Sequence, residues 1–100
     1  MFGTIGHVRT NPENEARFRE LHEEWRKEIR PKLPGAFLEL IGKPKDRPGE
    51  MVFVALAQDE ATYRQLAAMP EQDAWYRRFV ALTDGEPTWE DVEMEIAVQD

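Results

Sequence analysis

The sequence contains no cysteine and only two histidines. Without cysteine there is no disulfide framework, no thiolate nucleophile and no zinc site built on sulfur. The sequence also has no His-x-x-x-His pair, nucleophile elbow, phosphate-binding loop or dinucleotide-binding glycine motif. Their absence disfavours the familiar hydrolases and nucleotide-dependent enzymes. We therefore predict no metal site and no cofactor.

Long hydrophobic runs are also missing. The longest unbroken apolar run covers residues 51–57, whereas a helix needs roughly 20 apolar residues to cross a bilayer. The first residues contain neither the basic nor the apolar stretch of a secretion signal. We expect a single cytoplasmic domain over residues 1–100 that does not bind membranes.

Basic residues do not dominate any part of the chain, whose net charge is −7. Acidic and basic side chains cancel over residues 1–83, and the segment 84–100 holds seven acids and no base. An acidic surface of this kind repels phosphate backbones, so nucleic acid is not an expected partner. Acidic and apolar residues alternate at positions 91–96. We read that row as protection of an edge strand, with pairing to basic residues of a partner subunit and metal binding as alternatives.

Periodicity predicts alternating strands and helices. Asn11 and Pro12 are typical of a helix start, and Phe18, Trp25 and Ile29 recur at helical spacing. Pro70 should interrupt the second helical region. The predicted order is strand, helix, strand, strand, helix, strand, at residues 2–9, 11–30, 36–42, 51–57, 59–82 and 89–98.

This βαββαβ order predicts an α+β, ferredoxin-like antiparallel sheet with two helices on one face. The first and third strands should be central and the other two should lie at the edges. The third strand is apolar on both sides, so the face without helices needs a cover. A two-fold related copy of the chain is the simplest one, and we expect a homodimer.

Over nearly its whole length the chain resembles the antibiotic biosynthesis monooxygenase-like domains of the dimeric α+β barrel superfamily. The resemblance rests on the order of elements, on Pro34-Gly35-Ala36-Phe37 before the second strand, on residues 52–63, and on Met69-Pro70-Glu71. It implies cofactor-independent oxygenation, haem degradation or isomerisation as activities. Two positions depart from the common pattern: Ala57 stands where many members have Trp, and Gln72 where the haem-degrading branch has its iron-binding His.

His22 and His7 are the candidate catalytic bases, because imidazole titrates near neutral pH. His22 shares the apolar stripe of the first helix. Its alternative role is that of a core-edge histidine satisfied by a carbonyl or by a nearby glutamate such as Glu23 or Glu24. His7 lies on a central strand, and the alternation leaves open whether it faces the helices or the partner.

A pocket between sheet and helices should bind a small apolar or aromatic molecule. Its candidate lining includes one cation, Arg78, for an anionic or phenolic group. The other candidates are aromatic and are equally compatible with a plain hydrophobic core: Trp25, Tyr63, Trp75 and Phe79.

The function predicted on this basis is that of a cofactor-independent monooxygenase-like enzyme for a small aromatic or quinol-type molecule. The resemblance implies that a histidine deprotonates a phenol-type substrate, whose anion reacts with dioxygen. A non-catalytic dimeric module that binds a hydrophobic metabolite is one alternative. A small isomerase using the same base with Arg78 is another.

Overall fold

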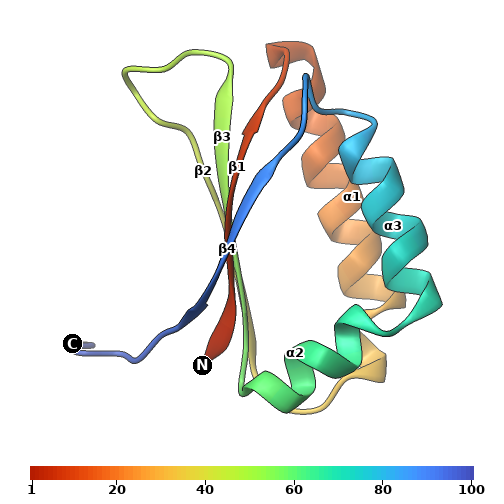
Figure 1. The fold of residues 1–100 in the computed structure, drawn as a ribbon, viewed down its shortest axis with the longest axis vertical. Coiled ribbons are helices and arrows are strands. Elements are labelled where there is room, and N and C mark those ends of the chain that lie inside the picture. Colours follow the sequence, from red (N-terminus) through yellow and green to blue (C-terminus); the bar gives the residue numbers. More distant parts are fainter.

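The computed structural model describes all residues, 1–100, as one antiparallel sheet covered by helices on one face (Figure 1). The strands are β1 (Phe2–Arg9), β2 (Phe37–Gly42), β3 (Glu50–Ala57) and β4 (Thr88–Glu93). The helices are α1 (Glu15–Glu28), α2 (Glu60–Ala67) and α3 (Pro70–Val80), with 3₁₀ turns at Pro12–Asn14 and Arg30–Lys32. The predicted α+β order is confirmed, and no helix has the length and hydropathy needed to cross a membrane.

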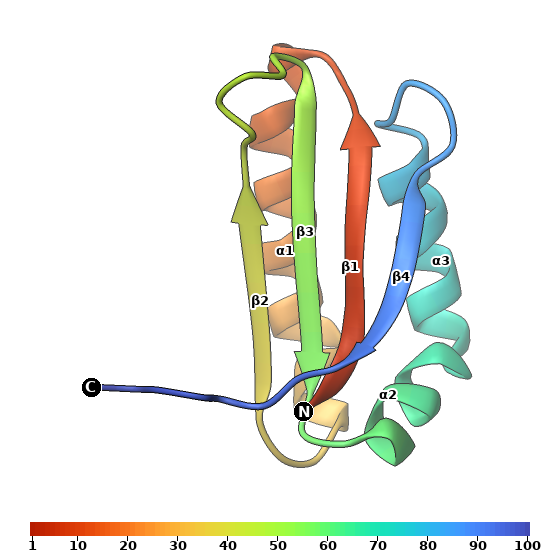
Figure 2. The same ribbon diagram turned by 60° about the vertical axis from the view of Figure 1, so that its left-hand side comes forward.

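The strand order is β2-β3-β1-β4, as predicted for a split βαβ arrangement (Figure 2). Ile5 in β1 pairs with Val54 of β3 on one side and with Glu90 of β4 on the other. Gly49 supplies the positive φ of the turn between β2 and β3, at +86°. The central strands β3 and β1 are therefore paired on both sides, and β2 and β4 form the two edges of the sheet.

The last strand is shorter than the predicted 89–98. Its final pair is Glu93 with Phe2, and one further backbone bond joins Met94 N to Met1 O. Beyond this point β1 has no more residues to pair with, so the tail leaves the sheet on the side away from the helices (Figure 1). Residues 89–98 alternate between polar and apolar as a strand does, but a strand also needs a neighbouring strand with which to form hydrogen bonds.

The helical regions also differ in detail from the prediction. Pro12 opens a 3₁₀ turn, α1 begins only at Glu15, and Asn11 makes no side-chain cap. The second region is two helices, because Pro70 occupies the first position of α3 and Met69 is extended. Asp59 caps α2 as expected, its carboxylate accepting from the backbone N of Thr62 at 2.8 Å.

The core lies between the sheet and the helices. Phe18 of α1, Phe53 of β3 and Phe79 of α3 are each at most 3% exposed. Their rings are tilted or edge-on, with centroids 4.9–5.3 Å apart, an arrangement that aromatic rings prefer. A second group, Trp25, Ile29, Leu33 and Leu66, fills the space near the start of α3.

The opposite face of the sheet has no helix. Leu38 and Leu40 of β2 are 44% and 53% exposed there, and Val52 and Val54 of β3 are half-buried. The expectation that both sides of β3 are apolar is therefore confirmed. The helix-free face of the sheet is therefore an apolar surface that is open to solvent.

Candidate functional site

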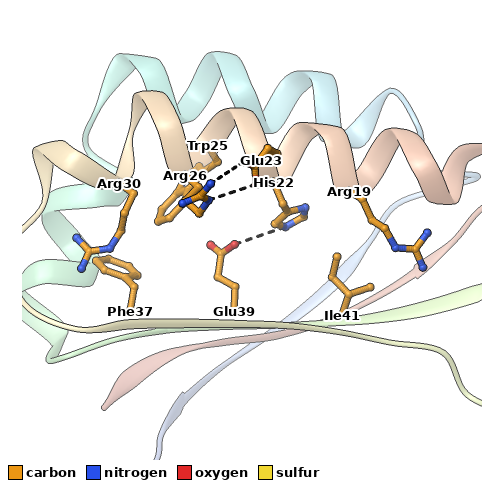
Figure 3. A pocket seen from close by; sticks show the side chains of 9 residues that line it. All are labelled: Arg19, His22, Glu23, Trp25, Arg26, Arg30, Phe37, Glu39 and Ile41. Carbon is orange, nitrogen blue, oxygen red and sulfur yellow. Dashed lines mark hydrogen bonds and ion pairs between the residues drawn. The ribbon is translucent and has the colours of Figure 1, made fainter.

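A groove of about 420 Å³ runs between α1 and the edge strand β2 (Figure 3). Helical spacing puts five α1 residues on its upper wall, which Arg30 of the following 3₁₀ turn extends, and strand alternation puts three β2 residues on its floor. It is lined by Arg19, His22, Glu23, Trp25, Arg26, Arg30, Phe37, Glu39 and Ile41. The groove therefore combines an apolar floor, charged rims and a titratable pair at its centre.

His22 is held in one tautomer. Its Nδ1 lies 2.8 Å from the carbonyl oxygen of Phe18, and since a carbonyl only accepts, Nδ1 must carry the hydrogen. The ring stacks on Phe53, with centroids 5.5 Å apart and planes 5° apart. Burial lowers the pKa of His22, more than the carbonyl contact raises it. Neutral His22 thus presents a basic Nε2 lone pair to the groove.

Glu39 faces that lone pair from the strand below. Its Oε2 lies 3.8 Å from His22 Nε2, and the two side chains are 24% and 17% exposed respectively (Figure 3). Burial raises the pKa of Glu39 from its ordinary value of 4.5 to about 7. Since burial disfavours both charges, both groups are neutral between the lowered pKa of His22 and about pH 7. In that range the protonated carboxyl of Glu39 is an acid and the neutral imidazole of His22 is a base, 3.8 Å apart.

The three arginines of the groove are held differently. Arg26 is paired with Glu23 at 2.7 Å, one helical turn away. Arg30 donates to the carbonyl oxygens of Leu33 and Gly35, and its guanidinium lies 5.0 Å from the ring centroid of Phe37. Arg19 has no acidic partner.

The structure brings two of the predicted site residues together. His22 and Trp25 both line the groove, and Trp25 Nε1 donates to Gln72 Oε1 at 2.8 Å. The ring of Trp75 packs edge-on against that of His22, with centroids 5.1 Å apart. Its indole Nε1 donates to the carbonyl oxygen of Leu21 at 2.7 Å, which is typical of a core residue. Phe79, 1% exposed, belongs wholly to the core.

Three other predicted residues lie elsewhere. His7 is exposed on the helix-free face, beside Val52, so it cannot act in the groove. Tyr63 packs edge-on against Phe2 at the far end of the domain, with centroids 5.3 Å apart. Arg78 pairs with Glu24 at 2.7 Å between α1 and α3. Each was placed on a correct element, but the elements turn these side chains away from the groove.

The two departures from the family pattern have structural roles here. Ala57 is fully buried opposite Phe2 and Phe37. Gln72 holds the indole of Trp25 through its amide oxygen. No three His, Asp or Glu side chains are grouped closely enough to hold a metal ion.

Sequence reasoning missed Glu39 as a site residue. The signal was present, because Glu39 alternates with Leu38 and Leu40 and so shares a face with Phe37 and Ile41. A lone carboxyl among the helix-facing residues of a strand is unusual enough to mark a site.

The fold is that of the antibiotic biosynthesis monooxygenase domains, as the sequence predicted. A proposed antibiotic biosynthesis monooxygenase of Deinococcus radiodurans superposes with a TM-score of 0.73 at 17% identity, covering 100% of this chain and 98% of that one. For a Caulobacter crescentus protein of the same description the TM-score is 0.75 at 14% identity, with 95% and 90% covered. SnoaB of Streptomyces nogalater, a cofactor-independent oxygenase, superposes with a TM-score of 0.64 at 16% sequence identity, and the match covers 97% of both chains. No protein-family model and no curated protein sequence matches the chain.

Proposed function

We propose that the protein is a cofactor-independent oxygenase of a small aromatic or quinol-type molecule, bound in the groove between α1 and β2. The observation that carries this proposal is the His22 Nε2 lone pair, fixed by the Phe18 carbonyl and directed at Glu39 over an apolar floor. Likeness of fold to SnoaB supports the same class of chemistry, although fold alone does not determine reaction.

Cofactor-independent oxygenation of such a substrate begins with the removal of a proton by a base. His22 Nε2 removes a proton from the enol or the CH₂ group of an anthrone-type substrate, leaving an electron-rich ring carbon. That carbanion reduces dioxygen, a C–O bond forms, and the peroxide takes the proton from His22. Removal of the second C–H proton breaks the O–O bond and releases water, so R₂CH₂ and O₂ give R₂C=O and H₂O. Glu39 Oε2 lies 3.8 Å from His22 Nε2, and the ionised form of Glu39 would stabilise the imidazolium that forms in each cycle.

Oxygen uptake with anthrone and with substituted hydroquinones tests the proposal. The wild-type protein should consume one O₂ per anthrone, and His22→Gln should reduce kcat/KM by at least about a hundredfold, the usual contribution of a general base. His7→Gln is the matched control, because it changes the same residue type on the other face of the sheet. The absence of oxygen uptake across the panel, or equal losses in both variants, would refute the assignment.

Non-catalytic binding of a hydrophobic metabolite is the second candidate. It is favoured by the packing of His22, whose ring is already stacked on Phe53 and bonded to Phe18 as a structural histidine would be. Such a module would gain thermal stability from anthrone or hydroquinone without turnover, since a ligand of the native state alone raises stability. The isomerase alternative loses its proposed anion anchor, because Arg78 is paired with Glu24 outside the groove.

A second copy of the chain is the proposed partner. The helix-free face exposes Leu38 and Leu40, and the tail beyond β4 exposes Met94, Ile96 and Val98. An isologous contact through this face would cover apolar surface that a monomer leaves in water. Lys43 and Arg47 already pair with Glu15 and Glu50 of their own chain, which leaves less basic charge for a partner's acidic tail.

Light scattering at micromolar concentration tests the dimer. The wild-type protein should have twice the 11.7 kDa chain mass. Val54→Lys, which puts a charge at the centre of the helix-free face, should give a folded monomer. Ala61→Lys, on an exposed position of α2, should remain a dimer. A monomeric wild-type protein would contradict the proposal.

A further inference from the structure

The groove has the opposite charge to the protein around it. The chain as a whole carries −7, yet the groove is lined by three arginines and only two acids. One of these acids, Glu23, is paired with Arg26, and burial raises the pKa of the other, Glu39, to about 7. The groove therefore keeps an excess of positive charge in either protonation state of Glu39.

Arg19 is the arginine best able to accept a new anionic partner. The guanidinium of Arg26 already makes two hydrogen bonds with Glu23, and that of Arg30 is fixed by two carbonyl oxygens. Arg19 is exposed and makes no ion pair. A planar guanidinium with free donors matches a carboxylate in geometry as well as charge.

Arg19 and His22 place two polar contacts along the same wall of the groove. The two residues are three positions apart on α1, which is roughly 4.5 Å along a helix axis. Figure 3 shows Arg19 near Ile41 at one end of the groove, His22 and Glu39 facing each other in the middle, and Arg30 above Phe37 at the other end. A fused aromatic ring system can lie on this apolar floor with one polar end at each basic group.

We infer that the groove selects a planar aromatic molecule that carries a carboxylate, bound by Arg19, in addition to the hydroxyl or acidic C–H group that faces His22. The part of the floor at Ile41, between Arg19 and His22, would hold the ring (Figure 3), and Arg19 would orient it by a charge-assisted hydrogen bond. The inference rests on the proposed function for the position of the reacting group, but not for the charge of the ligand.

Calorimetric titration with two matched probes tests this charge selection. The probes are 6-hydroxy-2-naphthoate and 6-(hydroxymethyl)-2-naphthol, which share the ring and the hydroxyl group and differ in the carboxylate. The naphthoate should bind about tenfold more tightly at pH 7 and low salt, in keeping with one charged hydrogen bond. The advantage should shrink in 0.5 M NaCl because the site is open to water.

Arg19→Gln should abolish the preference for the naphthoate and leave the affinity for the neutral probe unchanged. Arg17→Gln is the matched control: it removes the same charge from the same helix, but Arg17 faces α3 rather than the groove. Equal affinities of the two probes for the wild-type protein, no binding of the naphthoate, or equal effects of the two variants would overturn the inference.

The titration measures binding without turnover, so it separates this inference from the proposed reaction. A preference that depends on Arg19 in a protein that consumes no oxygen would support the ligand class and refute the oxygenase. Oxygen uptake with neutral substrates and no preference for the naphthoate would support the oxygenase and overturn the ligand class.

Discussion

Replacing Glu39 by Gln should make the protein more stable at alkaline pH. Gln has the size of the protonated carboxyl but cannot ionise, so it removes the cost of a charge buried beside His22. Glu39 is 24% exposed and lies within the groove floor, and burial raises its pKa from 4.5 to about 7. The folded state therefore keeps a proton that the unfolded state has already released.

The sign and size of the effect follow from this difference. Below pH 4.5 the carboxyl is protonated in both states, and the wild-type protein loses nothing. As the pH rises toward 7 its stability falls relative to that of Glu39→Gln, by about 1.4 kcal/mol per pH unit, and the difference levels off above 7. The total approaches about 3 kcal/mol, an upper limit because water reaches part of the side chain.

His22 acts in the opposite direction. Its pKa is lowered by burial, so its contribution to stability rises with pH between that lowered value and 6.5. The stability of the wild-type protein alone mixes the two effects. Subtracting it from that of Glu39→Gln removes the part of the His22 contribution that both proteins share, and leaves the carboxyl together with its coupling to His22.

Urea unfolding followed by tryptophan fluorescence, at fixed protein concentration from pH 4.5 to pH 9, measures this difference. Glu86→Gln, at an exposed loop position, is the control and should give a flat difference. A difference for Glu39→Gln that stays constant from pH 5 to pH 9, or a variant less stable than the wild type at pH 8, would refute the reasoning.

Other substitutions test the packing. Phe18→Ala empties a fully buried aromatic position and should lower the free energy of unfolding by about 3–5 kcal/mol in urea titrations. Asp59→Ala removes the cap on Thr62 N and should cost about 1 kcal/mol in the same assay; no change would mean that the cap is idle. Gln72→Leu leaves the indole N–H of Trp25 unpaired and should cost about 1–3 kcal/mol, whereas Gln72→Glu keeps an acceptor and should cost less.

Most of the fold could be predicted because local signals and tertiary structure agree. The turn at Arg47-Pro48-Gly49 needs a positive φ, and Gly49 has one. The apolar run at 51–57 could be satisfied only inside a sheet, and it pairs on both sides. The end of β4 could not be read this way, because it depends on where β1 stops rather than on the residues of β4 itself.

The site was less predictable because it depends on how elements pack. Helical spacing puts His22 on the apolar stripe, and the carbonyl partner foreseen as its alternative role is the one observed. Its carboxyl neighbour, however, is Glu39 from β2, and not Glu23 or Glu24 on its own helix. Arg78 lies on the expected helix, but α3 packs so that this side chain meets Glu24 rather than the groove.

A fold shared with monooxygenase domains does not by itself determine what this chain does. The evidence for function therefore lies in the groove: an imidazole held by the Phe18 carbonyl, a carboxyl whose pKa burial raises to about 7 and an arginine without an ion pair. Each of these depends on one or two side chains and can be changed singly. His22 stacks on Phe53, so a substitution of similar size, such as His22→Gln, disturbs the aromatic core least.

The most direct test of the account is ¹⁵N NMR of the His22 imidazole between pH 6 and pH 8. The burial that lowers the pKa of His22 predicts a neutral ring at pH 7, and the Phe18 carbonyl then places the hydrogen on Nδ1 and the lone pair on Nε2. Binding of 6-hydroxy-2-naphthoate should shift the Nε2 signal. An imidazolium at pH 7, hydrogen on Nε2, or an Nε2 signal that ignores saturating naphthoate would contradict the assignment of His22 as the base of the groove.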